Sequence, residues 1–201
     1  VTAPAGWTEA EAVDGNGVRG RVWTKTAAAG DAESTVTVTS SAIIKSTISV
    51  AAYRSTLGSP SLTASDATVV NSSASSHTAP SVPLQKAGSW LVNVWGEKSG
   101  AAATWTLPAG TTSRTTTAAT GGGKVSQVLA YSNGPVAGTT SGTRIATTAA
   151  AVSRGVQFSL AIAPVTTEDP GPPNTPPTAA FSFSCTYLLC SFNASGSGDA
   201  D

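Results

Sequence analysis

Residues 90–95 read WLVNVW, a stretch of aromatic, β-branched and apolar side chains arranged with a period of two. That period is typical of a β-strand, because successive side chains of a strand point to opposite faces. The same pattern recurs at 156–162 (VQFSLAI), 36–39 (VTVT) and 48–53 (ISVAAY). We therefore predict four strands that face one core.

The segments between these strands carry turn chemistry. Clusters such as 14–17 (DGNG), 58–60 (GSP) and 133–135 (NGP) favour tight turns, and no segment places apolar residues at helical spacing over three turns. The sequence therefore predicts an all-β fold, an antiparallel two-sheet sandwich of the jelly-roll or immunoglobulin-like type over residues 1–163.

Composition excludes several classes of function. Charged residues form 11% of the chain, against about 25% in typical proteins, and eleven basic side chains balance eleven acidic ones. A protein that binds nucleic acid through its phosphates needs a surplus of Lys and Arg, so we expect no nucleic-acid partner. The longest apolar runs have about five residues, far short of the roughly 20 that span a membrane, so we expect no membrane insertion.

Catalysis is not expected either. The single histidine, His77, lies in the polar stretch 71–78 (NSSASSHT), with no Asp or Cys nearby in sequence, which predicts a solvated loop residue. Two cysteines and one distant histidine are too few for a four-ligand zinc site. We predict no catalytic residue, no metal and no cofactor, and a disulfide between Cys185 and Cys190.

Five tryptophans in a chain with few aromatic residues suggest a surface that stacks on sugar rings. Alternation puts Trp90 and Trp95 on opposite faces of their strand. Trp90 and Trp23 lie beside Val and Leu and are predicted to be core residues. The predicted ligand-binding residues at the surface are Trp7, Trp95 and Trp105.

The two halves of the first domain contain similar segments in the same order, an internal similarity that we call the internal echo. Residues 4–8 (PAGWT) and 108–112 (PAGTT) open two series of similar segments, as a duplication would produce. The second series is preceded by a strand at 88–95, whereas only three residues precede the first. The echo therefore predicts that an N-terminal strand of the sandwich is missing, and that upstream residues or a strand from another copy would fill its place.

Composition changes after Ala163. Residues 164–177 contain six prolines and are predicted to form an extended linker. Residues 178–201 then contain two alternating segments, 179–185 (AAFSFSC) and 190–194 (CSFNA). With PPTAAF before and FNASGSGDAD after, this region resembles the start of a PKD domain, an immunoglobulin-like sandwich, in a version with a cysteine in each of its first two strands. The resemblance implies a truncated second domain.

The first domain resembles a Ser/Thr/Gly-rich β-sandwich module of actinobacterial surface proteins and of minor tail proteins of their phages. The resemblance rests on residues 4–9 (PAGWTE), 22–27 (VWTKTA), 30–38 (GDAESTVTV) and 51–54 (AAYR). It implies a non-catalytic module, extracellular or at the cell surface, with a structural or adhesive role. Its partner would be a cell-surface or extracellular polysaccharide or protein, or another copy of the chain. Two alternatives are a phage tail protein in the virion and a carbohydrate-binding accessory of a secreted hydrolase.

Overall fold

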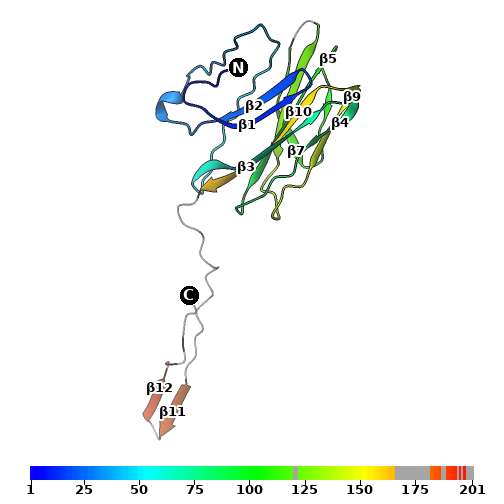
Figure 1. Ribbon diagram of the computed structural model, residues 1–201. Helices are drawn as coiled ribbons and strands as arrows, with labels where there is room; N and C mark the ends of the chain where they lie inside the picture. The colour runs from blue at the N-terminus through cyan, green and yellow to red at the C-terminus, as the bar shows by residue number, and fades with distance from the viewer. Residues whose placement is uncertain (120–121, 166–181, 187–188, 194, 196, 198–201) are drawn as a thin grey trace. The chain divides into compact units, whose positions relative to one another are not determined.

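A computed structural model describes residues 1–119, 122–165, 182–186, 189–193, 195 and 197. The chain divides into two compact units, Val1–Val165 and Thr166–Asp201. Among the described residues, the regular structure of each unit is almost entirely β-strand and the sheets are antiparallel (Figure 1). The only helix among the described residues is a single 3-10 turn, η1 (Ala29–Asp31), and none of these residues lies in a helix able to cross a membrane.

A five-stranded sheet forms the centre of the first unit. Its order is β3-β10-β5-β8-β7, and all four pairings are antiparallel. The strands are β3 (Ser59–Val70), β10 (Gly155–Val165), β5 (Trp90–Ser99), β8 (Lys124–Ser132) and β7 (Thr111–Ala118). Because every strand alternates, the sheet has two distinct faces that different parts of the chain cover.

One face packs against a three-stranded sheet in the order β4-β9-β6, which gives the sandwich that the sequence predicted. These strands are β4 (Ala74–Ala79), β9 (Arg144–Val152) and β6 (Trp105–Thr106). The apolar residues between the two sheets are few and mostly small. They are Ala79, Trp95, Val128, Ala130 and Ala146.

The other face of the central sheet is covered by the hairpin of β1 (Thr8–Gly15) and β2 (Val18–Thr24), and by part of the loop that follows η1. Val18 and Val22 of the hairpin pack on Val156 and Phe158 of β10. Ala51 and Tyr53 of the loop pack on Val92, Leu129 and Leu160. This face buries large apolar side chains, whereas the sandwich face buries many polar ones.

The predicted strands at 90–95 and 156–162 are confirmed as parts of β5 and β10. Those at 36–39 and 48–53 are wrong, because neither stretch joins a sheet, although Thr39 forms an isolated bridge with Thr2. Burial still alternates from residue 47 to residue 54, as it would in a strand. The predicted turn at 58–60 is also wrong, because β3 begins at Ser59.

The internal echo corresponds to a shared local structure at its start. Gly6 and Gly110 both adopt positive φ angles, 77° and 74°, and each is followed by an antiparallel hairpin, β1-β2 or β7-β8. The halves then diverge, since β9 and β10 have no strands corresponding to them within residues 25–58. Among the described strands, β2 pairs with β1 alone, whereas β8 pairs with both β7 and β5. The missing strand stays a prediction.

In the second unit, β11 (Ser182–Thr186) and β12 (Leu189–Asn193) form an antiparallel hairpin. Cys185 and Cys190 face each other in its register. Facing Cα atoms of antiparallel strands are about 4.5–5.5 Å apart, which is within the range a disulfide requires. The disulfide itself stays a prediction. Of the linker predicted at 164–177, Pro164 and Val165 belong to β10, and the rest lies outside the described residues.

Candidate functional site

Three side chains form a row across one end of the central sheet. The Trp90 ring stacks on the Tyr131 ring, with centroids 5.7 Å apart and planes 14° apart. The guanidinium carbon of Arg114 lies 4.6 Å from the centroid of Tyr131. Trp90 and Tyr131 are half-buried and Arg114 is exposed, so the row combines aromatic surface with a cation.

Three neighbouring strands position this row. Trp90 lies in β5, Tyr131 in β8 and Arg114 in β7, and a bulge between Ser113 and Thr115 sets Arg114 out of the regular register. Bulges often redirect a side chain in this way. Flat rings and a planar guanidinium can stack on the apolar face of a sugar or on another planar group.

This row was not predicted from the sequence. Alternation shows which residues of a strand share a face, but it does not show which of the two faces is buried. Trp90 and Trp95 do lie on opposite faces, as predicted. Trp95, however, is fully buried, so its prediction as a surface residue is wrong. Trp90, predicted as core, is only half-buried and carries the stacking contact.

The other tryptophans lie in three separate places. Trp7 ends the turn that precedes β1, Trp23 lies in β2 and Trp105 lies in β6, and all three are half-buried. Trp105 packs against the core cluster around Trp95, and its indole nitrogen is buried without a hydrogen-bond partner. The predicted trio of Trp7, Trp95 and Trp105 does not form one exposed surface, because Trp95 is buried.

His77 is not the solvated loop residue that the sequence predicted. It lies in β4 and is fully buried between the two sheets. Its Nε2 is 3.1 Å from Oγ1 of Thr148, the side-chain amide of Gln157 is 3.4 Å from its Nδ1, and the Trp105 ring meets it edge-on at 5.0 Å. Burial lowers the pKa of His77, which favours the neutral imidazole.

Glu97 is a second buried titratable side chain, near the end of β5. The hydroxyls of Ser99 and Ser126 lie close to it, but Ser99 donates to the carbonyl of Ala101 and Ser126 accepts from the N–H of Ala103. Neither carboxyl oxygen has a partner at hydrogen-bonding geometry. Burial therefore raises the pKa of Glu97, and its polar neighbours offset only part of that effect.

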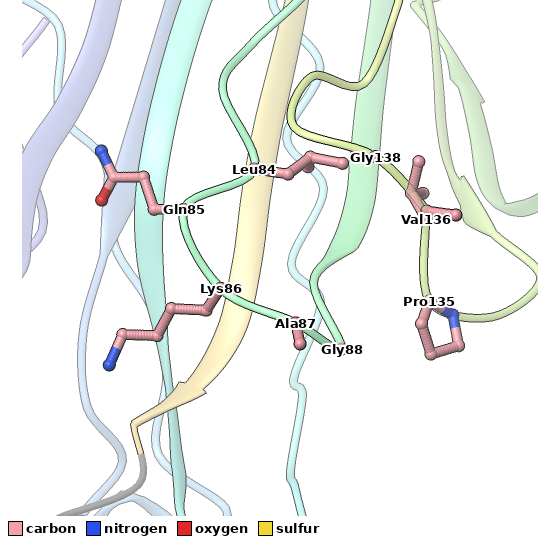
Figure 2. Close-up of a pocket in the computed structure, with 9 residues that line it drawn as sticks. Leu84, Gln85, Lys86, Ala87, Gly88, Pro135, Val136 and Gly138 are labelled. Carbon is pink, nitrogen blue, oxygen red and sulfur yellow. The ribbon is translucent and has the colours of Figure 1, made fainter. Parts of the chain in front are cut away.

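The surface also carries a shallow groove of about 380 Å³ between residues 84–88 and 135–138 (Figure 2). Backbone hydrogen bonds fix its walls, from the N–H of Leu84 to Thr139 and from that of Val136 to Ser89, both at 2.8 Å. Figure 2 shows Leu84 pointing toward the opposite wall, whereas Gln85 and Lys86 point away from it. The groove is therefore largely apolar and offers little for polar recognition.

A second hollow, of about 400 Å³, lies at the other end of the central sheet. Lys98 and Arg154 line it together with Ser73, Ser99 and Ser153. In the part of the chain that the structure describes, no three His, Cys, Asp or Glu side chains are placed to hold a metal ion.

Comparison with known proteins gives no relative to guide the assignment. No family model, no curated protein and no solved structure matches the chain.

Proposed function

We propose that the chain is a non-catalytic module of an extracellular or cell-surface protein, with a structural or adhesive role. The observation that carries this proposal is the location of its two best acid–base groups. His77, between the sheets of the sandwich, and Glu97 are both fully buried, so neither side chain reaches the solvent. The single histidine therefore contributes to packing.

The modular arrangement of the chain supports the same role. Two compact units follow each other, and residues 164–177, around the boundary between them, contain six prolines. Such segments act as semi-rigid spacers in extended proteins. We further propose that the β11-β12 hairpin begins a PKD domain, which the pairing of its two cysteine-bearing strands supports.

The test couples the full chain to beads and measures two quantities, the retention of actinobacterial cells or cell-wall polysaccharide and the release of reducing sugar ends. We expect retention without release. Release of reducing ends that disappears in His77→Gln or Glu97→Gln would overturn the non-catalytic assignment. Absence of retention would overturn the adhesive role.

A carbohydrate-binding role is a second candidate, favoured by the stacked pair of Trp90 and Tyr131 beside Arg114. Removing an aromatic platform from a sugar site weakens binding strongly, because stacking supplies much of the apolar contact. We expect Trp90→Ala and Arg114→Ala to lose retention of polysaccharide at least about tenfold, as a loss of about 1.4 kcal/mol would produce. Trp7→Ala is the control, and an equal loss in that variant would contradict this site.

A further inference from the structure

Exposed apolar side chains concentrate in one loop of the first unit. Seven large apolar residues are exposed in the described part of the chain, and five of them lie within the fifteen residues from 43 to 57. These five are Ile43, Ile44, Ile48, Val50 and Leu57. Exposed apolar side chains concentrated in one segment are a common feature of interaction sites.

The same loop presents backbone groups without partners. Within the described residues, the main chain from 43 to 54 belongs to no sheet and forms no backbone hydrogen bond. Unpaired N–H and C=O groups beside apolar side chains form an edge that another strand can join.

The loop nevertheless lies on the sheet as a strand would. Thr47, Ser49, Ala51 and Tyr53 are half-buried, whereas the even-numbered residues between 46 and 54 are exposed. Ala51 and Tyr53 pack into the core, and the Thr47 hydroxyl donates to the side-chain oxygen of Gln127 at 3.2 Å. The loop therefore has the period and the docking of a strand and lacks only a pairing partner.

We propose that residues 43–54 are an edge for self-association, at which two copies of the chain pair antiparallel across a two-fold axis. The unpaired main chain calls for an extended polypeptide as partner, because only another backbone matches its repeating donors and acceptors. An identical copy supplies that backbone with the same β-branched pattern. The two charged residues of the segment, Lys45 and Arg54, lie near its ends, so the uncharged residues 46–53 at the centre of the pair bring no like charges opposite each other.

The alternation restricts the register of this pair. Facing residues of an antiparallel pair point to the same side, so odd-numbered residues must face odd-numbered ones. Lys45 is odd-numbered and Arg54 is even-numbered, so these two residues cannot face each other in the pair. The register that places Ser49 on the axis brings Ile48 of each copy opposite Val50 of the other, which gives two favourable β-branched pairs.

This inference deepens the proposed structural role by naming a partner, a second copy, but its test measures association and not retention of cells. One can therefore fail while the other stands. The full chain is measured by sedimentation velocity over a range of concentrations. We expect a dimer that the double variant Ile48→Lys/Val50→Lys converts to a monomer, because lysines would then face each other across the axis.

The matched control is Ile145→Lys on β9, since Ile145 is 47% exposed and Ile48 is 52% exposed. The control should remain a dimer. A wild-type chain that stays monomeric at every concentration would overturn the proposal, even if it captured an added foreign strand. So would a dimer that the double variant leaves intact.

A cross-linking pair tests the register without relying on a disruptive change. Ser49→Cys places one cysteine from each copy on the axis, within the Cα separation that a disulfide spans. Ser46→Cys places the cysteine opposite Ala52. Mild oxidation should convert Ser49→Cys to a covalent dimer much faster than Ser46→Cys. Equal rates for the two variants, or no cross-linking of either, would exclude the proposed two-fold pair.

Discussion

The indole N–H of Trp95 donates a hydrogen bond to the backbone carbonyl of His77 at 3.0 Å, from the central sheet to the sheet that covers it. Both residues are fully buried, so this bond joins the two layers of the sandwich at their centre. A buried indole N–H requires a hydrogen-bond partner, and the carbonyl of His77 supplies it. Trp95 can therefore lie in an interior built mainly from small side chains.

His77 should make stability depend on pH. Its pKa is lowered in the folded state, so the unfolded chain takes up a proton more readily once the pH falls below the ordinary value of 6.5. We expect the free energy of unfolding to be constant above this pH and to fall below it, by at most about 1.4 kcal/mol per pH unit for one proton. Urea denaturation of wild type and His77→Gln from about pH 5 to about pH 8, roughly 1.5 units on either side of the ordinary pKa, measures it. A wild-type slope that persists unchanged in His77→Gln would contradict the assignment.

Glu97 should have the opposite dependence. Its pKa is raised in the folded state, so its favourable contribution exists at low pH and is lost as the pH rises through the folded pKa, where a charged carboxylate becomes buried. We expect Glu97→Gln to stabilise the chain at neutral pH, by about 1.4 kcal/mol for each unit by which burial raises the pKa of Glu97, because the neutral amide places no charge in the interior. The difference should shrink below the ordinary pKa of 4.5. Thermal unfolding at neutral and acidic pH measures both, and a neutral-pH destabilisation would show that the carboxylate is satisfied after all.

Gly20 should not tolerate a methyl group. A Cβ at this position would lie 2.4 Å from Cζ of Phe158, whose ring is buried between β10 and the β1-β2 hairpin. We expect Gly20→Ala to lower the free energy of unfolding by about 1–3 kcal/mol, as overpacking does. Gly100→Ala is the control, because no atom lies within 4 Å of its added Cβ. Chemical denaturation of both variants tests the contact, and equal stability would mean that the ring moves aside without cost.

Cys185 and Cys190 should be oxidised when the chain is kept in an oxidising medium. The register places them opposite each other, and disulfides persist outside the reducing cytosol. Intact-mass measurement should find the chain two hydrogens lighter than its reduced form, and an alkylating reagent should label it only after reduction. Immediate labelling of both thiols in chain that was kept in an oxidising medium and never reduced would rule the bond out.

The fold class could be predicted from alternation, but which alternating segments join a sheet could not. The 90–95 and 48–53 stretches have similar patterns, yet the first lies in the centre of a five-stranded sheet and the second pairs with nothing described. Pairing depends on neighbours distant in sequence, which a local pattern does not report.

The interior of the sandwich was equally hard to predict. The β4 strand was missed because its sequence, ASSHTA, has no large apolar residue, and its two buried side chains are His77 and Ala79. Polar side chains can be buried when they find partners, and those partners lie on other strands: Thr148 on β9 and Gln157 on β10. Sequence position gave no sign of that proximity.

The polar filling of the sandwich interior has a thermodynamic consequence. Besides His77, the buried residues include Asn93, whose amide donates to the Ser159 hydroxyl at 2.8 Å, as well as Ser126 and Thr148. Exposing polar surface on unfolding lowers the heat capacity, whereas exposing apolar surface raises it. A domain with such an interior has a smaller heat-capacity increment than one with an aliphatic core of equal size, so its stability changes less steeply from cold to warm surroundings.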